Sequence, residues 1–143
     1  MLTNATSIHT QMLPNGLTIL VQSMPWLRTA ALSFNLPGGV CCESVDRGGL
    51  SGLVCEMVQR GAGAYSSRDL VAVQDNLGLD RNSGVNSAMV SFGAAMPAES
   101  LRQAIDLYAD IVRCPHLPQD QLDEARMMSL QELRAIQDSR RIG

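Results

Sequence analysis

Two runs of branched and alternating apolar residues near the start of the chain predict β-strands. Residues 17–21 (Leu-Thr-Ile-Leu-Val) follow the turn sequence Leu-Pro-Asn-Gly at residues 13–16. An Asn-Gly turn often joins a hairpin, but here we expect it to begin a strand rather than to join two. Residues 29–36 predict a second strand, because Ala30, Leu32 and Phe34 alternate before Pro37 and fit a helix poorly.

The next two segments have helical periodicity. After Gly48 and Gly49, an apolar stripe at i, i+3, i+4, i+7 and i+8 consists of Leu50, Leu53, Val54, Met57 and Val58. This helix is expected to end at residues 61–63, and Ser66 or Ser67 is a suitable N-cap for the next helix. The second helix is expected to turn inward Leu70, Val73 and Leu77 before it ends at Gly78.

The pattern then returns to strands before two further helices. Residues 79–85 predict a weak, polar strand, and residues 88–95 predict a stronger one that Pro97 closes. The helix that follows carries an apolar stripe of Leu101, Ala104, Ile105, Tyr108, Ile111 and Val112. After a break at residues 114–118, a last helix runs from about Asp120 to the end. The order β-β-α-α-β-β-α-α predicts an α+β fold, with helices on one face of a mixed or antiparallel sheet.

Composition narrows the classes of function. The chain has 143 residues, of which 45% are hydrophobic, 17% charged and 3% aromatic, and its net charge is −3. One domain over residues 1–143 is expected, truncated at its C-terminal end. The mild acidity and 11 Lys and Arg residues argue against a nucleic-acid partner. No apolar run is long enough for a membrane span, and without a signal peptide we expect a cytoplasmic protein with reduced cysteines.

The cysteines and histidines of the chain form no local metal-binding motif. Cys41, Cys42, Cys55 and Cys114 form no C-x-x-C pair, and His9 and His116 lie far apart in the sequence. A vicinal disulfide between Cys41 and Cys42 would be strained, so two thiols are the expected state.

Three residues on predicted helices have both a structural and a functional interpretation. Glu132 shares a helix face with Ala125, Met128, Ser129 and Ile136, where a carboxylate needs water, a cation or a metal as partner. Gly52 and Glu56 are one turn apart on the helix after Gly49. Spacing alone favours a structural interpretation for both residues: Gly52 lets a neighbouring segment approach the helix closely, and the Glu56 side chain is solvated.

Several segments in order resemble the pitrilysin/insulinase family of zinc peptidases, which includes the mitochondrial processing peptidase. Residues 13–19 (Leu-Pro-Asn-Gly-Leu-Thr-Ile) resemble the opening strand of that family, and residues 38–43 resemble its Gly-Ser-x-x-Glu segment. Residues 49–57 stand where the family has Gly-Leu-x-His-x-x-Glu-His-Met, and residues 61–62 resemble its Gly-Thr. The Pro-His-Leu-Pro turn at residues 115–118 and the acidic helix after it complete the resemblance.

The resemblance implies that the catalytic residues are lost. Active members bind zinc through two histidines of H-x-x-E-H and a later glutamate, and the motif glutamate is the general base. The two histidine positions are here Gly52 and Glu56, the base position is Cys55, and only Glu132 retains a ligand type. No zinc or other cofactor is therefore expected. A substitute site of Cys55, Glu56 and Glu132 is disfavoured because adjacent helical side chains point about 100° apart, and His116 is expected to be a surface or capping residue.

The resemblance also suggests a role. We expect a non-catalytic member of the family that helps to bind peptide or assembles with a catalytic paralogue or with itself. The stretch that matches the family's substrate-binding edge strand contains Asn82, Ser83 and Gly84. Two alternatives stay open: an active zinc metalloendopeptidase with unusual ligands, and a structural scaffold subunit.

Overall fold

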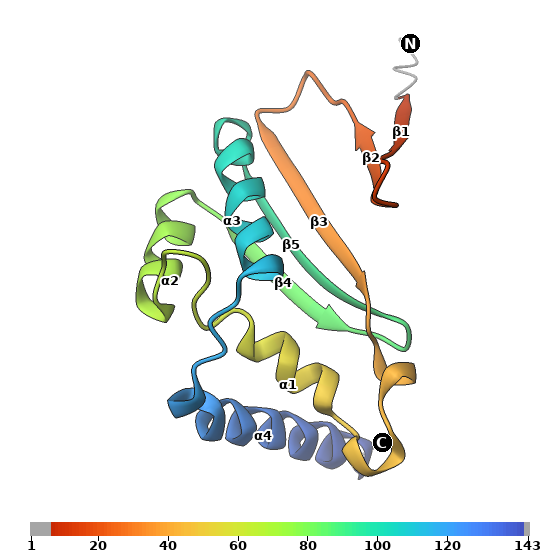
Figure 1. Cartoon of the computed structure of the whole chain (residues 1–143), viewed down its shortest axis with the longest axis vertical. Helices are drawn as coiled ribbons and strands as arrows, with labels where there is room; N and C mark the ends of the chain where they lie inside the picture. The colour runs from red at the N-terminus through yellow and green to blue at the C-terminus, as the bar shows by residue number, and fades with distance from the viewer. Residues whose placement is uncertain (1–6, 142–143) are drawn as a thin grey trace.

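The computed structural model describes residues 7–141, and within the last helix it describes no side chains for residues 132, 133 and 135–141. Its centre is an antiparallel sheet in the order β3-β5-β4 (Figure 1). The strands span Thr29–Pro37 (β3), Asp80–Val85 (β4) and Met89–Pro97 (β5). The expected α+β fold with helices packed on one face of an antiparallel sheet is confirmed.

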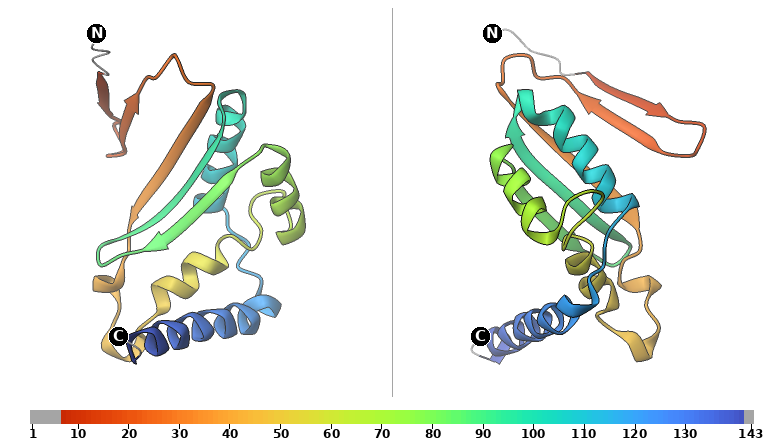
Figure 2. Two further views of the ribbon diagram at one scale, coloured as in Figure 1. Left: turned by 180° about the vertical axis from the view of Figure 1, so that it is seen from behind. Right: turned by 60° about the vertical axis from the view of Figure 1, so that its left-hand side comes forward.

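One face of this sheet carries the core. Helices α3 (Leu101–Arg113) and α2 (Ser67–Asn76) cover it, as the two views of Figure 2 show. The buried residues from the sheet and these helices include Leu70, Phe92, Ala94, Met96, Ala104, Leu107, Tyr108 and Ile111. Alternation along β5 and the 3.6-residue period of α3 both direct these apolar side chains to the same layer. The predicted N-cap Ser66 is confirmed, because its Oγ accepts the backbone N–H of Asp69 at 3.3 Å.

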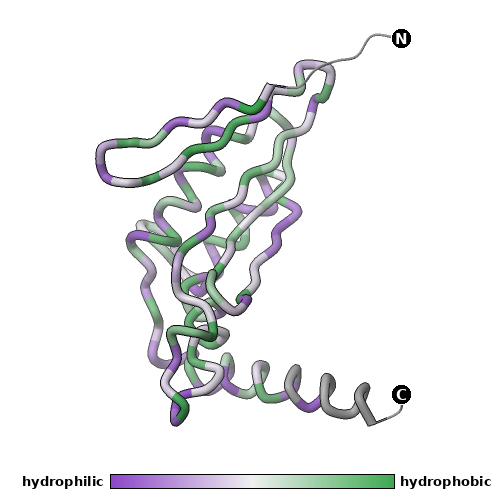
Figure 3. The backbone as a smooth tube through the Cα atoms, turned by 90° about the vertical axis from the view of Figure 1, so that its right-hand side faces the viewer, coloured by the Kyte–Doolittle hydropathy of each residue, from purple (hydrophilic) through white to green (hydrophobic). Residues whose placement is uncertain are grey.

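A separate two-stranded hairpin corrects the expectation for the N-terminal turn. Strand β1 (Ile8–Met12) pairs with β2 (Thr18–Gln22), and residues 13–17 connect them. The expectation that this turn only begins a strand was wrong. Every residue of both strands is exposed, and the hydropathy colouring of Figure 3 shows apolar positions along the hairpin. The segment before the turn was missed because no burial imposes a clear alternation on it.

The first helix and the last helix lie beyond the end of the sheet. Helices α1 (Leu50–Met57) and α4 (Leu122–Arg141) pack against each other, and α1 also contacts β4 (Figure 1). Met57 is buried as the apolar stripe of α1 suggests, but Leu50 and Val54 remain 44% and 45% exposed. Short 3₁₀ turns at residues 40–42, 45–47, 98–100 and 119–121 connect the elements. Among the described residues, no helix has the length and apolar character needed to cross a membrane.

The backbone hydrogen bonds determine which groups face the two outer edges of the sheet. The bonds that flank the β3–β5 ladder run from Ala98 N–H to Arg28 C=O (2.9 Å) and from Gly38 N–H to Ala88 C=O (3.2 Å). Residues that lie opposite each other on antiparallel strands alternate between hydrogen-bonded and non-hydrogen-bonded pairs. The even-numbered residues of β3 therefore form the hydrogen bonds to β5, and the N–H and C=O groups of its odd-numbered residues point to the outer edge of the sheet. The bond from Asn86 N–H to Met89 C=O (2.9 Å) sets the same alternation for β4, so its odd residues also face the free edge.

Candidate functional site

The start of α1 is fixed by the carboxylate of Glu43. Its two oxygens accept the backbone N–H groups of Gly49 at 2.8 Å and Ser51 at 2.6 Å. These N–H groups belong to the first turn of a helix, where no intrahelical acceptor is available. The hydrogen bonds from the Ser51 and Gly49 backbones hold the pKa of Glu43 below its ordinary value. Glu43 therefore positions the helix that carries the degenerate motif.

Gly52 leaves an open surface at the first histidine position of the motif. The residue is exposed, and among the described residues outside its own helix a Cβ added to it would meet no atom within 4 Å. The described side chains therefore include no close neighbour of the kind expected at this glycine. With no side chain, Gly52 offers nothing that could bind a metal.

Cys55, at the general-base position, is buried against β4. The residue is 6% exposed. Burial raises the pKa of the Cys55 thiol above its ordinary value, and a hydrogen bond with Ser83 only partly opposes this effect. A thiol with a raised pKa stays protonated at neutral pH, so it is neither a base nor a thiolate ligand there.

Glu56, at the second histidine position, is held by an arginine. Glu56 Oε1 accepts a hydrogen bond from Arg60 Nη2 at 3.0 Å, and Arg60 Nη1 donates to Glu124 Oε2 at 3.1 Å. The same guanidinium approaches Gln121 and Met128, both at 3.5 Å, and the Arg60 side chain is only 13% exposed. Arg60 thus joins α1 to α4, and the solvated Glu56 expected from spacing is corrected to an ion-paired one.

Arg60 was missed in the sequence analysis, although one signal for it exists. Glu56 and Arg60 are four residues apart, which places them on one helix face as a potential ion pair. The contact with Glu124 spans 64 residues of sequence, and no local pattern encodes it.

The predicted substrate-binding stretch lies beside this helix. Gln59 Nε2 donates to Cys55 C=O at 2.8 Å and to Ser83 Oγ at 3.1 Å, so the side chain bridges α1 and β4. In the part of the chain that the structure describes, β4 pairs only with β5. By the alternation given above, Ser83 faces the free edge with its N–H and C=O, whereas Asn82 and Gly84 bond into the sheet. Whether any of the three binds substrate stays a prediction.

Two further residues named from the sequence lie apart from this site or outside the description. His116 is exposed, and its Nε2 lies 2.7 Å from the carbonyl oxygen of Gly63, where the ring secures the loop after α1. It is thus a loop-capping residue, as expected. Glu132 is on α4, but its side chain lies outside the described residues.

The described residues at the motif positions do not fit a zinc ion. Gly52 has no ligand atom, the Cys55 thiol is directed at β4, and the Glu56 carboxylate is directed at Arg60 and α4. Zinc sites in proteins use convergent nitrogen, sulfur or carboxylate ligands. Among the described side chains, no group of three or more His, Cys, Asp or Glu is placed to hold a metal ion.

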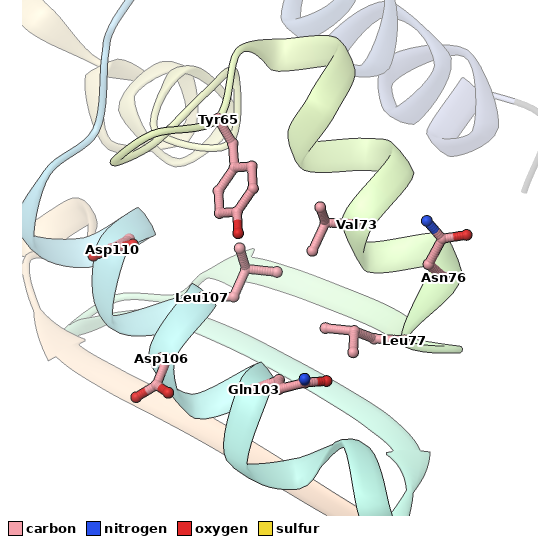
Figure 4. Close-up of a pocket in the computed structure, with 8 residues that line it drawn as sticks. All are labelled: Tyr65, Val73, Asn76, Leu77, Gln103, Asp106, Leu107 and Asp110. Atoms are coloured by element: carbon pink, nitrogen blue, oxygen red, sulfur yellow. The ribbon is translucent and has the colours of Figure 1, made fainter.

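The described residues also form cavities away from these side chains, including one between two helices and one beside α1. The larger, of about 350 Å³, is between α2 and α3, where Tyr65 points toward Leu107 (Figure 4). The smaller, of about 280 Å³, is an apolar groove formed by α1 and residues 117–122. Neither of these two cavities is lined by Gly52, Cys55 or Glu56.

Comparison of the sequence with known families and proteins gives consistent matches. The family model described as "Insulinase (Peptidase family M16)" matches residues 18–141. An uncharacterized zinc protease of Rickettsia felis is 23% identical over 127 residues, which are 89% of this chain and 31% of that protein. The mitochondrial-processing peptidase subunit beta of Lentinula edodes is 23% identical and shares 87% of this chain and 27% of its own length. The chain thus spans about a third of the length of these relatives.

Solved structures confirm the fold. A protease from Helicobacter pylori superposes with a TM-score of 0.82 at 13% identity, over 90% of this chain and 31% of the other. Pitrilysin superposes with a TM-score of 0.78 at 20% identity, over 87% of this chain and 13% of the other.

Proposed function

Because the chain belongs to the insulinase family, peptidase family M16, we propose that it is a non-catalytic member of that family. It binds an extended peptide, or assembles with a catalytic zinc peptidase, without cutting peptide itself. The observation that carries this proposal is the ion pair of Glu56 with Arg60, which joins α1 to α4 where active members would place a metal ligand.

Loss of the base supports the same conclusion independently of the metal. General base catalysis contributes roughly 10²–10⁴-fold to a reaction rate. The neutral, buried thiol of Cys55 cannot take a proton from water at neutral pH. Restoring a metal alone would therefore leave the chain without its hydrolytic step.

The free edge of β4 supports peptide binding. An extended peptide can add to an exposed sheet edge through main-chain hydrogen bonds. The outward N–H and C=O groups of Arg81, Ser83 and Val85 offer such bonds beside α1. The hydroxyl of Ser83 contacts Gln59 and Cys55, so its backbone N–H and C=O stay available at the edge.

Assembly with a catalytic chain is supported by the relatives. One of them is named a subunit of a processing peptidase, so the family includes chains that work as part of a larger enzyme. We place this assembly in the cytoplasm, where the free cysteines of the chain would stay reduced.

Peptide binding is tested with a short fluorescein-labelled peptide of alternating threonine and valine. Fluorescence anisotropy should show binding by the natural chain, and Ser83→Pro should weaken it at least about fivefold, since proline removes an outward N–H. Ser83→Ala, which loses the hydroxyl but keeps the backbone, and Ser33→Pro, on the other edge, are the matched controls. Equal binding by Ser83→Pro and its controls would contradict the proposal.

Two observations separate this proposal from an active peptidase and from a structural scaffold: whether the chain cleaves peptide, and whether a zinc peptidase co-purifies with it. Cleavage that a chelator abolishes would favour an active peptidase with unusual ligands. If a zinc peptidase with an intact H-x-x-E-H motif co-purifies and its activity needs both chains, a purely structural scaffold is excluded. Co-purification with no peptidase, together with no peptide binding, would favour the scaffold.

A further inference from the structure

The cavity of about 350 Å³ between α2 and α3 has an apolar floor and an aromatic end. Figure 4 shows Val73 and Leu77 from α2 facing Leu107 from α3, and the ring of Tyr65 closing one end. Leu107 is only 4% exposed and belongs to the core itself. Small-molecule sites in proteins are typically concave and mostly apolar, with volumes from about 300 Å³ upward. The cavity therefore has the size and lining of a site for a small organic molecule.

Two carboxylates give the polar part of the lining a negative charge. Asp106 and Asp110 are four residues apart on α3, so they lie on one face of the helix, one turn apart. No arginine side chain that the structure describes forms an ion pair with either of them. The sequence offers no lysine, because its 11 basic residues are all arginines. Two like charges at this spacing destabilise a helix slightly, and a bound cation would remove that cost.

The position of the Asp110 carboxylate depends on a glycine in the loop before α2. Gly63 has a φ of +54°, and a Cβ on it would lie 2.7 Å from Asp110 Oδ2. A residue without a side chain leaves this space to the carboxylate. The loop is fixed in turn by two hydrogen bonds of Gly63: its N–H donates to Cys114 C=O at 3.0 Å, and its C=O accepts from His116 Nε2 at 2.7 Å. These contacts hold the loop that carries Tyr65 against Asp110.

We propose that this cavity binds a small aliphatic amine in its ammonium form. The carboxylates of Asp106 and Asp110 recognise the ammonium group, and the Tyr65 ring, which closes one end, adds to the attraction for a cation. The alkyl stem covers Val73 and Leu107 and removes their apolar surface from water. A neutral molecule of the same shape would leave the two carboxylates without a counter-charge.

A chemical-shift titration by NMR at pH 7 tests the recognition of charge, with pentan-1-amine as the ligand and pentan-1-ol as the neutral control of the same length. The natural chain should bind the amine at least about tenfold more tightly than the alcohol. Asp106→Asn together with Asp110→Asn should abolish this difference. Asp123→Asn, which changes an exposed aspartate of α4 outside the cavity, should preserve it. Equal binding of amine and alcohol by the natural chain, or binding of neither, would overturn the proposal.

A second measurement uses the natural chain and does not depend on the folding of a variant. A water-soluble carbodiimide activates carboxylates, a bound amine converts them to amides, and mass spectrometry locates the products. Because the sequence has no lysine, no lysine of the chain competes for the activated groups. Pentan-1-amine should modify Asp106 and Asp110 at least about fivefold faster than Asp123. Equal rates at the three carboxylates would contradict binding in this cavity. Binding of a lysine-containing peptide in place of the free amine would overturn the assignment to a small amine.

Discussion

The carboxylate of Glu43 accepts hydrogen bonds from two backbone N–H groups at the start of α1, so the stability that it gives to this helix start depends on pH. Its pKa is lowered from 4.5 in the folded chain, so the unfolded chain binds more protons as the pH falls. Folding stability from this group is fully present above pH 4.5 and is lost as the pH falls through the folded pKa.

We therefore predict that Glu43→Gln is less stable than the natural chain at pH 7 and less sensitive to acid. Urea unfolding from pH 7 to pH 3 measures both effects. Glu99→Gln, which changes an exposed carboxylate next to α3, is the control and should retain the natural pH dependence. Parallel curves for Glu43→Gln and the natural chain would contradict the capping role.

Cys55 differs from the other three cysteines in burial. Cys41, Cys42 and Cys114 are exposed, and burial raises the pKa of the Cys55 thiol. Because the thiolate is the reactive form, a disulfide reagent should modify three thiols rapidly at pH 8 and the fourth only after denaturation. In Cys55→Ser, denaturation should release no further reactive thiol. Rapid modification of all four thiols would show that Cys55 is accessible and available for chemistry.

At the scale of elements, Arg60 is the side chain that connects α1 to α4. It is largely buried and carries hydrogen bonds to two carboxylates. Arg60→Met keeps the length of the side chain but leaves Glu56 without its partner. We predict a loss of about 1–3 kcal/mol in the free energy of unfolding. Glu124→Gln, at the exposed end of the network, should cost less than about 1 kcal/mol.

Chemical denaturation of these variants measures the effect, and Arg126→Met, which changes an exposed arginine of α4, is the matched control. A double-mutant cycle with Glu56→Gln isolates the pair. If Arg60→Met is no less stable than Arg126→Met, the connection between the two helices does not depend on this ion pair.

Helices and strands with a periodic apolar pattern could be predicted from the sequence. The exposed hairpin and the contacts between residues far apart in the sequence could not. Burial imposes the patterns around Leu70, Phe92 and Ile111, so their helices and strand are readable in the sequence. Strand β1 lies in an exposed hairpin, where no core requires a pattern. At the candidate site, the missing ligand at Gly52 and the missing base at Cys55 could be predicted from the sequence. The ion pair of Glu56 could not, because its partner Arg60 is also held by Glu124 on a helix far away in the sequence.

At the scale of the whole molecule, the proposed peptide-binding site is an edge of the sheet. The free edge of β4, which begins with Asp80 and Arg81, is flanked by α1. Among the described elements, α2 and α3 cover one face of this sheet (Figure 2). Peptide binding at such an edge uses backbone hydrogen bonds and needs no reactive side chain, which agrees with the non-catalytic role that we propose.

The absence of a functional zinc site is the central claim, and metal analysis tests it most directly. The chain is prepared with Cys41→Ser and Cys42→Ser to remove two exposed thiols, incubated with zinc, dialysed and measured by mass spectrometry for metal. We predict no stoichiometric zinc in this background and stoichiometric zinc after Gly52→His, Cys55→Glu and Glu56→His together. Stoichiometric zinc in the background chain that disappears in Glu132→Ala would contradict the account.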